Sequence, residues 1–451
     1  MKTTRAGDWM DVNPNLSEMD FTQFHLRVST ERYHAREYLM RERERLWMRV
    51  WQIAGRANEI PEAGDWMEYR LFDQSWILVR GRDAKIRGFV NSCRHRGNQL
   101  CRGRGNTARF TCRYHNWTYG LDGQLLAVAK PDFDAPLEEF VGAKQDLGLL
   151  DVPVECFGGF IFLNPDRNAA PLAEFLGGAA DALAPYHLED MVPVGLNVRE
   201  RLECNWKVVM DAFGEGYHTQ GVHPQLISVV NLGQERFHRY RDHGVSTAPF
   251  GAPALAAFDA ERQVEAYMKL PTDSFPGFID VLPRFAARVD RFRDPAGALN
   301  FPPGTNARFL LQQATRDTLT AKGLDVGGLT DCQMIDYQFW LFFPNIFIQV
   351  CAGETTIIMV EPDPEGDPNR CFWRVMFMQF LPPEQRAAQY TPLREIPEGE
   401  HFPYFLALEQ DFEQMPVQQT GLRNSTLGHL VLTKQEPRVA HFHAALDRWI
   451  K

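Results

Sequence analysis

The chain has 451 residues, of which 44% are hydrophobic and 24% charged, and its formal net charge is −10. A length of this order predicts two or three domains, each able to bury its own core. The acidic balance argues against a general affinity for nucleic acid or for anionic membranes. Most of the eight cysteines stand singly along the chain, which is not typical of a disulfide framework.

The beginning of the sequence has no apolar core of signal-peptide length. The most apolar stretch, 339–350, is interrupted by Pro344 and is too short to span a bilayer. We therefore expect a soluble cytoplasmic protein. Residues 30–54 place apolar side chains at helical spacing, which predicts a helix whose Trp47 and Trp51 pack on a core.

Short runs rich in β-branched and aromatic residues follow, separated by turn residues. They predict a small antiparallel β domain that presents loops for binding. The expected strands are 66–71, 75–80, 86–91, 109–113 and 158–163.

Two clusters of metal-ligand residues lie within this predicted domain, Cys93-x-His95 and Cys112-x-x-His115. Two thiolates and two imidazoles predict a metal site. Mixed zinc sites usually pair Cys with Cys and His with His along the chain. Here each cluster holds one Cys and one His, so each loop can give a sulfur to one iron and a nitrogen to the other. A Rieske [2Fe–2S] centre requires this division; structural zinc is the alternative.

The sequences around both clusters, CRHRG from Cys93 and CRYHNWTY from Cys112, resemble the cluster-binding motif of the Rieske non-heme iron oxygenases, the ring-hydroxylating oxygenase alpha subunits. Asn116 departs from the family pattern, which usually has glycine at this position. The departure bears on the backbone geometry of the loop and leaves the four expected cluster ligands in place.

A second candidate site follows further along the chain. If residues 206–219 form a helix, Asp211, Glu215 and His218 share one face. His223 lies roughly 140° away from His218 on an ideal helix, so the two imidazoles meet only if the helix ends and the chain turns back. Two neutral histidines and a carboxylate form the facial triad of Fe(II) oxygenases. A structural or surface histidine pair is the alternative.

The same stretch is similar to the iron-binding helix of the Rieske oxygenases, with Asn-Trp-Lys, an acid, Glu-Gly-Tyr-His and a further His. The resemblance implies that His218 and His223 bind the iron. It also implies that Glu215 links His218 to His115 of a neighbouring subunit, and Asp211 is the second acidic candidate for a catalytic role. Many ring-dihydroxylating relatives have aspartate at the Glu215 position, whereas glutamate resembles the branch that acts on quaternary ammonium compounds.

The third iron ligand should be a carboxylate far downstream. Asp411 best fits the family pattern of an acid shortly before Gln and Gly-Leu. Glu409 and Glu413 are the competing candidates.

The resemblance covers nearly the whole chain and implies an α+β fold. A small antiparallel β Rieske domain precedes a larger helix-grip catalytic domain, whose antiparallel sheet is flanked by helices. Residues 340–350 are expected to form one buried strand of this sheet, and His441 and His443 to lie on a helix surface or at a subunit contact. The expected parts are 1–44 (a helical segment packing on the catalytic domain), 45–165 (Rieske domain) and 166–451 (mononuclear iron domain).

The resemblance further implies the terminal oxygenase component of a multicomponent system, a mono- or dioxygenase using O2 and electrons from NAD(P)H. A separate reductase, with or without a ferredoxin, is expected, because the chain has no recognisable flavin or nicotinamide fingerprint. The family's head-to-tail ring implies a homotrimer, with or without a separate β subunit.

The expected substrate is an apolar aromatic or polycyclic compound, as in aromatic hydrocarbon catabolism. A monooxygenase or demethylase acting on a quaternary ammonium or methoxy compound is the alternative, since aromatic side chains also bind quaternary ammonium groups. Outside the enzyme class, the rivals are a Rieske electron carrier and a zinc-stabilised binding module.

Overall fold

The computed structural model describes residues 26–128, 144–227, 235–250, 258–269 and 275–451. The chain divides into two compact units. The smaller unit is Met40–Phe175 with Pro364–Gly366. The larger unit takes in the chain up to Leu39, Leu176–Asp363 and Asp367–Lys451. The boundaries expected at 44/45 and 165/166 remain predictions.

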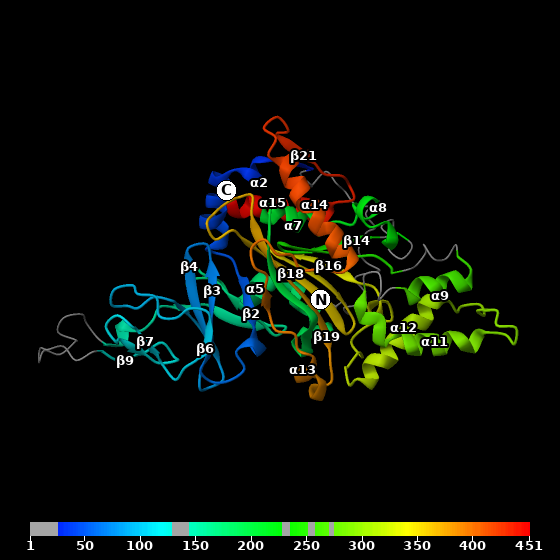
Figure 1. Ribbon diagram of the computed structural model, residues 1–451, viewed down its shortest axis with the longest axis horizontal. Coiled ribbons are helices and arrows are strands. Elements are labelled where there is room, and N and C mark those ends of the chain that lie inside the picture. Colours follow the sequence, from blue (N-terminus) through cyan, green and yellow to red (C-terminus); the bar gives the residue numbers. More distant parts are fainter. Residues whose placement is uncertain (1–25, 129–143, 228–234, 251–257, 270–274) are drawn as a thin grey trace, which may run out of the picture. The chain divides into compact units, whose positions relative to one another are not determined.

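In its described residues, the smaller unit contains three antiparallel sheets (Figure 1). Their strand orders are β10-β5-β4-β3-β6, β11-β12-β2 and β7-β8-β9. The strands are β2 (Gln52–Arg56), β3 (Asp65–Leu71), β4 (Gln74–Arg80), β5 (Ile86–Val90), β6 (Arg104–Asn106), β7 (Phe110–Thr111), β8 (Thr118–Tyr119), β9 (Leu125–Ala127), β10 (Asp151–Val152), β11 (Val154–Phe157) and β12 (Phe160–Leu163). The expectation of a small antiparallel β domain is confirmed.

A hydrophobic core lies behind the loops of this unit. Ile77 and Val79 of β4 pack in it with Phe89 of β5, and the same core takes in Cys93 and Cys112. The metal-ligand loops are thus anchored in the core by their cysteines.

The helix expected over 30–54 is interrupted and ends early. It consists of α2 (Glu31–His34), α3 (Arg36–Glu42) and one π-helical turn, Arg43–Trp47. Trp47 and Trp51 are buried, as expected. The prediction is wrong beyond Trp47, because residues 48–50 form a turn and bend and Gln52–Arg56 pair with β12 as strand β2; tertiary pairing overrides the local helical pattern.

The larger unit is built on an eight-stranded sheet of order β14-β15-β16-β17-β18-β19-β13-β20. All neighbouring strands are antiparallel except the pair β13 and β20. The strands are β13 (Met191–Leu202), β14 (Arg236–Tyr240), β15 (His243–Thr247), β16 (Gln338–Phe342), β17 (Ile346–Cys351), β18 (Glu354–Pro362), β19 (Cys371–Phe380) and β20 (Arg394–Glu395).

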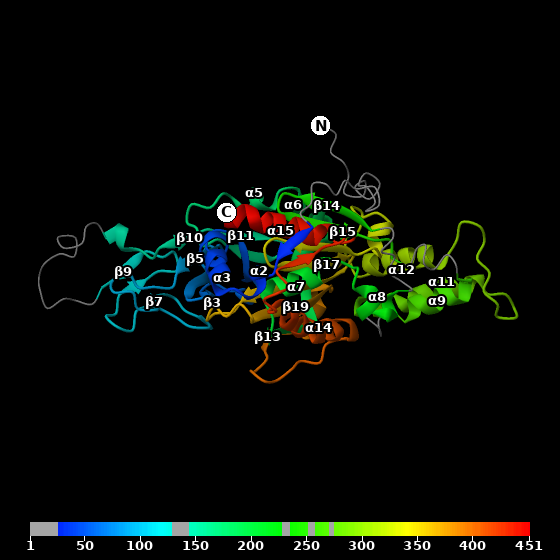
Figure 2. The same cartoon turned by 90° about the horizontal axis from the view of Figure 1, so that it is seen from above.

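Three helices pack on one face of this sheet, namely α7 (Trp206–Ala212), α14 (Leu406–Leu422) and α15 (Pro437–Ile450) (Figures 1 and 2). The ring of Phe213, at the end of α7, lies 5.0 Å from that of Phe347 in β17. The ring of Phe412 in α14 lies 5.8 Å from that of Trp373 in β19. The expected α+β fold, with an antiparallel sheet flanked by helices, is confirmed.

The remaining elements of the larger unit include a two-stranded sheet and several shorter helices. Among the helices of the described residues, none is long and apolar enough to pass through a lipid bilayer. These elements are β1 (Arg27–Ser29) with β21 (His429–Val431), α6 (Gly178–Leu183), α8 (Thr219–Val222), α9 (Ala260–Met268), α11 (Leu282–Val289), α12 (Ala307–Ala321) and α13 (Pro383–Gln389), while α5 (Leu172–Leu176) lies at the division between the two units.

The single strand expected over 340–350 is instead the hairpin of β16 and β17. Phe342 pairs with Ile346 at its tip. Pro344 and Asn345 lie in the connecting turn, where both residue types are favoured. The hairpin places residues of both strands on the face that the helices cover.

Candidate metal centres and substrate cavity

The two metal-ligand loops of the smaller unit have the same backbone geometry. The amide of Gly97 donates to the carbonyl of Cys93 at 2.9 Å, and the amide of Asn116 donates to that of Cys112 at 2.9 Å. Gly97 has φ +72° and Asn116 has φ +58°, so both are left-handed. Asparagine tolerates this region better than most non-glycine residues, which explains how Asn116 fills a position where the family usually has glycine.

The structure brings all four predicted cluster ligands to one end of the unit. Cys93 and Cys112 are buried, whereas His95 is exposed and His115 half-buried. The two imidazole rings lie 4.5 Å apart, edge to face. The hydroxyl of Tyr119 lies 3.2 Å from Sγ of Cys93. The sulfurs therefore face the core and the imidazoles face outward.

The surroundings of these residues favour metal-binding protonation states. Burial raises the pKa of Cys112, but the amides of Tyr114 and His115 donate to its sulfur and bring the pKa below its ordinary value. Burial, with His115 and Arg96 nearby, lowers the pKa of His95. Thiolate and neutral imidazole are the forms that bind metal.

The arrangement fits a dinuclear cluster better than a single zinc ion. Within the described residues, no three of these four side chains bring their donor atoms within 4.8 Å of one another. A tetrahedral zinc with bonds of about 2.0–2.3 Å would hold them closer than that. A centre that takes sulfur at its inner end and nitrogen at its outer end matches the observed division.

The second predicted site lies at a break between two helices. The helix expected over 206–219 stops at Ala212, and α8 spans only Thr219–Val222. Glycine disfavours helix, and Gly214 lies so close to α15 that a Cβ atom there would come 2.7 Å from Cγ2 of Val439. The break allows His218 and His223, at the two ends of α8, to face one another, with ring centroids 5.1 Å apart.

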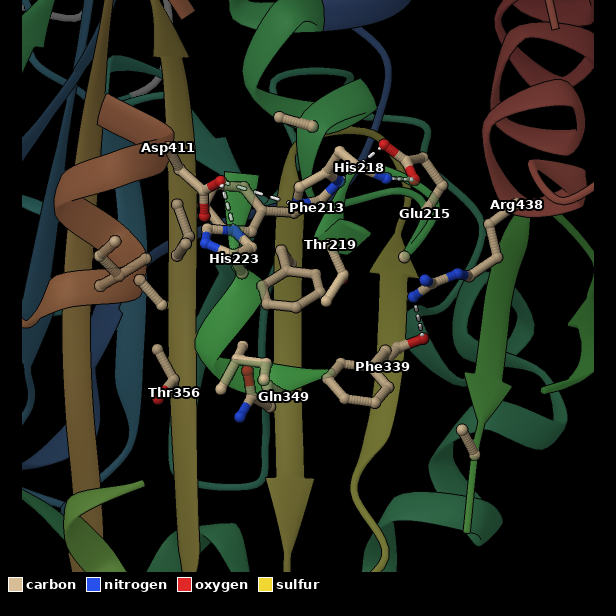
Figure 3. A pocket seen from close by; sticks show the side chains of 18 of the residues that line it. Phe213, Glu215, His218, Thr219, His223, Phe339, Gln349, Thr356, Asp411 and Arg438 are labelled. Atoms are coloured by element: carbon tan, nitrogen blue, oxygen red, sulfur yellow. Dashed lines mark hydrogen bonds and ion pairs between the residues drawn. The ribbon is translucent and has the colours of Figure 1, made fainter. Parts of the chain in front are cut away.

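Both histidines direct Nε2 at the same carboxylate oxygen (Figure 3). Oδ1 of Asp411 lies 3.0 Å from Nε2 of His223 and 3.6 Å from Nε2 of His218. His223 and Asp411 are buried, and His218 is partly exposed. Two imidazole nitrogens and one carboxylate converging in this way fit a divalent iron, with positions left open for other ligands.

Each histidine is held from behind by a second partner. Nδ1 of His218 lies 2.7 Å from Oε1 of Glu215, whose other oxygen accepts from the amide of His218 at 3.0 Å. Nδ1 of His223 lies 2.8 Å from Oε1 of Gln410. Such partners fix the ring orientation and leave Nε2 free for the metal. Gln410 was not predicted, since nothing in the sequence but its place beside Asp411 points to it.

The carboxylates around His218 make it more basic than an ordinary histidine. Burial lowers the pKa of His218, but the hydrogen bond and charge of Glu215 and the charge of Asp411 outweigh burial and raise it above the ordinary value. A cation at this place is thus favoured by two carboxylates.

The competitors of Asp411 on α14 face elsewhere. Oε1 of Glu409 lies 2.7 Å from Nε2 of His401, and its other oxygen accepts from the amide of Tyr404. Glu413 is exposed. Asp411 is therefore the carboxylate of this helix that the structure brings to the two histidines.

Asp211, the second acidic candidate, does not line the cavity beside the histidines. Its carboxylate accepts from the hydroxyl of Tyr33 at 2.5 Å and lies 3.0 Å from Nε2 of His443. The helix break is the reason that it does not share a face with Glu215 and His218. His443 and His441 are both buried, so the expectation of a helix surface for this pair is wrong.

A cavity of about 130 Å³ opens beside the histidines and Asp411 (Figure 3). Glu235 and Arg438 form a buried ion pair in its wall, 3.5 Å apart, and Arg438 also donates to the carbonyl of Phe339. Gln349 and Thr356 contribute neutral polar groups. Most of the lining is apolar, including Phe213, Phe275, Phe339, Phe347, Phe405 and Ile358.

Comparison with known families agrees with both sites. Residues 186–451 match the family model "Ring hydroxylating alpha subunit (catalytic domain)", and residues 50–140 match "Rieske [2Fe-2S] domain". The chain belongs to the ring-hydroxylating oxygenase alpha subunits, the Rieske non-heme iron oxygenases. The cofactors of this family's two domains are a Rieske [2Fe–2S] cluster and a mononuclear iron, and the two sets of side chains described above fit them.

Curated relatives act on different kinds of substrate, as their names state. The glycine betaine monooxygenase oxygenase subunit of Chromohalobacter salexigens is 36% identical over 192 residues, 42% of this chain and 41% of the relative. The carnitine monooxygenase oxygenase subunit of Acinetobacter baumannii is 26% identical over 64% of this chain and 71% of its own. The biphenyl 2,3-dioxygenase subunit alpha of Rhodococcus jostii is 34% identical over 42% of this chain and 41% of its own. The match to the first curated relatives thus spans only 41% to 42% of their length.

Solved structures share the fold over nearly the full chain. A quaternary ammonium Rieske monooxygenase that oxidises carnitine superposes with a TM-score of 0.64 at 16% identity, covering 95% of this chain and 96% of the other. Naphthalene 1,2-dioxygenase with bound indole gives a TM-score of 0.64 at 19% identity, covering 97% and 95%. At these identities the likeness establishes the fold alone.

Proposed function

We propose that this chain is the terminal oxygenase component of a multicomponent Rieske system that hydroxylates an apolar aromatic or polycyclic substrate with O2 and electrons from NAD(P)H. The observation that carries the proposal is the convergence of His218, His223 and Asp411 at the edge of an apolar, phenylalanine-lined cavity. A carrier of electrons would need only the cluster loops, and a zinc-stabilised module would need neither redox activity nor the site of His218 and His223.

The residues have distinct proposed roles. Cys93 and Cys112 would hold one iron of the cluster, and His95 and His115 would hold the other. The cluster supplies single electrons and the mononuclear iron activates dioxygen when both are bound. The imidazoles and carboxylate of the second site fix the position of the iron, and the apolar cavity excludes water and orients the substrate.

Glu215 is the proposed link between subunits. It hydrogen-bonds His218 and lines the cavity, so it lies next to the proposed iron ligands. In the proposed head-to-tail homotrimer, Glu215 would also contact His115 of a neighbouring copy. A separate reductase, with or without a ferredoxin, supplies the electrons.

A second substrate class has specific support. The cavity is lined by Phe213, Phe275, Phe339, Phe347 and Phe405. Aromatic faces bind quaternary ammonium groups through cation–π contacts. Glu215 replaces the aspartate of many ring-dihydroxylating relatives, and several curated relatives are named for glycine betaine or carnitine. A monooxygenase or demethylase acting on a quaternary ammonium or methoxy compound is therefore the alternative.

The first test is iron and acid-labile sulfide analysis, with EPR of the reduced protein purified from iron-replete cells. We expect about three irons and two sulfides per chain and a Rieske-type signal. If the protein contains about two irons and two sulfides, Fe(II) is added to reconstitute the second site. A protein that still takes up no further iron is an electron carrier. Zinc without sulfide contradicts the oxygenase proposal.

A further inference from the structure

Two polar side chains stand on the sheet floor of an otherwise mostly apolar cavity. Gln349 of β17 and Thr356 of β18 are paired directly across the two strands. Side chains alternate between the faces of a strand, so Phe347 and Ile358, two positions away from them, lie on the same face. All four line the cavity.

Neither polar group is satisfied by the protein. Among the described residues, the structure gives the side-chain amide of Gln349 and the hydroxyl of Thr356 no hydrogen bond. By contrast, the side chain of Gln338 on the neighbouring part of the sheet has a hydrogen-bond partner. Its Oε1 accepts from Nε1 of the Trp340 indole at 3.0 Å. Polar groups in a mostly apolar cavity are normally paired with protein, solvent or ligand. A bound molecule with a matching polar group would provide the partner that the protein does not.

The pair lies across the cavity from the metal-binding side chains (Figure 3). His223 and Asp411 are at one end of the view and Gln349 and Thr356 at the other. A molecule that spans the cavity would thus lie near the metal-binding side chains at one end and near neutral donors and acceptors at the other.

The charged side chains of the cavity wall already have partners, either each other or the proposed iron ligands. Arg438 pairs with Glu235 and donates to Phe339, and Glu215 holds His218. The end formed by Gln349 and Thr356 offers an amide and a hydroxyl, each of which donates and accepts. These groups suit a neutral substituent, whereas a quaternary ammonium has no hydrogen to donate and a carboxylate would lack a cationic partner there.

We propose that Gln349 and Thr356 determine substrate specificity: the substrate is a compact apolar ring compound with a neutral hydroxyl or carbonyl group at the end remote from the site of oxidation. The inference rests on the proposed oxygenase function and narrows its substrate class. The cavity of about 130 Å³ is comparable with the roughly 150 Å³ that accommodates benzene in an engineered protein.

The test is calorimetric binding of three probes, toluene, p-cresol and glycine betaine, to the iron-loaded protein. Toluene and p-cresol share their apolar body and differ by one hydroxyl. The variants are Gln349→Leu and Thr356→Val, which keep the side-chain volume, with exposed Gln389→Leu as the matched control. We expect wild type and control to bind p-cresol about tenfold or more tightly than toluene, because a site built for a hydroxyl rejects the analogue that lacks it. Gln349→Leu should abolish this preference and Thr356→Val should reduce it.

The outcomes separate this inference from the oxygenase function itself. Equal binding of toluene and p-cresol, no binding of either, tighter binding of glycine betaine, or a preference that survives both substitutions overturns the inference. Metal and sulfide analysis of the same preparations decides the oxygenase function independently. The unfolding temperature and cluster spectrum of each variant show that it is folded, and if Gln349→Leu does not fold, Thr356→Val carries the test.

Discussion

Nε2 of His223 lies 3.0 Å from Oδ1 of Asp411, although the two residues are 188 positions apart in the chain. His218 approaches the same oxygen from the other end of α8. Three donors from two distant segments meet only if the helix that carries Asp411 packs beside the broken helix, so the carboxylate is the most direct point at which to test the site.

Replacement of Asp411 by alanine should remove the mononuclear iron and leave the cluster intact. We expect about one iron fewer per chain, with unchanged sulfide and an unchanged Rieske EPR signal, because the loss of a charged ligand leaves two neutral imidazoles. Glu413→Ala, on the exposed side of the same helix, is the control and should keep its full iron content. Equal iron loss in both variants, or none in either, would assign the third ligand elsewhere.

Gln410 should tune the iron affinity without binding the metal. Its Oε1 holds Nδ1 of His223 at 2.8 Å, and partners of this kind typically contribute 10–100-fold in metal affinity. Gln410→Leu is thus expected to weaken Fe(II) binding by about that factor, measured by competition with a chelator. The exposed Gln414→Leu should behave as wild type. An unchanged affinity would show that His223 needs no support from this side chain.

Glu215→Ala should leave the cluster unchanged and strongly reduce coupled turnover. The Rieske EPR spectrum is expected to stay the same, since Glu215 is not one of the proposed cluster ligands, while coupled turnover falls by more than about 100-fold as His218 loses its partner and the proposed bridge is removed. Iron content is measured alongside, and Fe(II) is added back to saturation. Normal coupled turnover in the variant would remove Glu215 from the account.

His441 should make the larger unit less stable in acid. Burial, with Arg448 and Arg239 nearby, lowers the pKa of His441 to about 4, and Asp242 only partly opposes this. An unfolded histidine titrates near about 6.5, so the unfolded chain takes up the proton first as the pH falls. The contribution of neutral His441 to the free energy of unfolding is therefore fully present above about pH 6.5. It declines between that pH and about pH 4, and the loss is about 2 kcal/mol at pH 5.

The measurement for His441 is urea unfolding at pH 7 and pH 5. His441→Phe should lose this part of the pH dependence, and the exposed His429→Phe should retain it. If wild type and His441→Phe lose stability in parallel, other groups dominate the acid sensitivity.

The amino-acid sequence was most informative where chemistry is local. Cys93, His95, Cys112 and His115 are readable because ligand type and spacing repeat within two short loops, and the structure brings them together. The helix break after Ala212 was not predicted, because Asp211, Glu215 and His218 continue at helical spacing through it; in the structure Gly214 packs closely against Val439 of α15. That long-range contact is invisible to helical periodicity.

The polar end of the cavity was missed for a similar reason. Gln349 and Thr356 are unremarkable in sequence and acquire their role only through the register between β17 and β18. His441 and His443 were misplaced because a charged or polar residue on a helix is usually exposed, whereas Asp211 and Tyr33 surround His443 with hydrogen-bonding partners.

The distance in sequence between His223 and Asp411 also sets an order of events during synthesis. A ribosome adds roughly 5–20 residues per second, so the carboxylate is made some 10–40 s after the histidine. The cluster loops, complete by His115, are finished well before. The mononuclear site is therefore complete only once synthesis has passed Asp411, well after both cluster loops have been made.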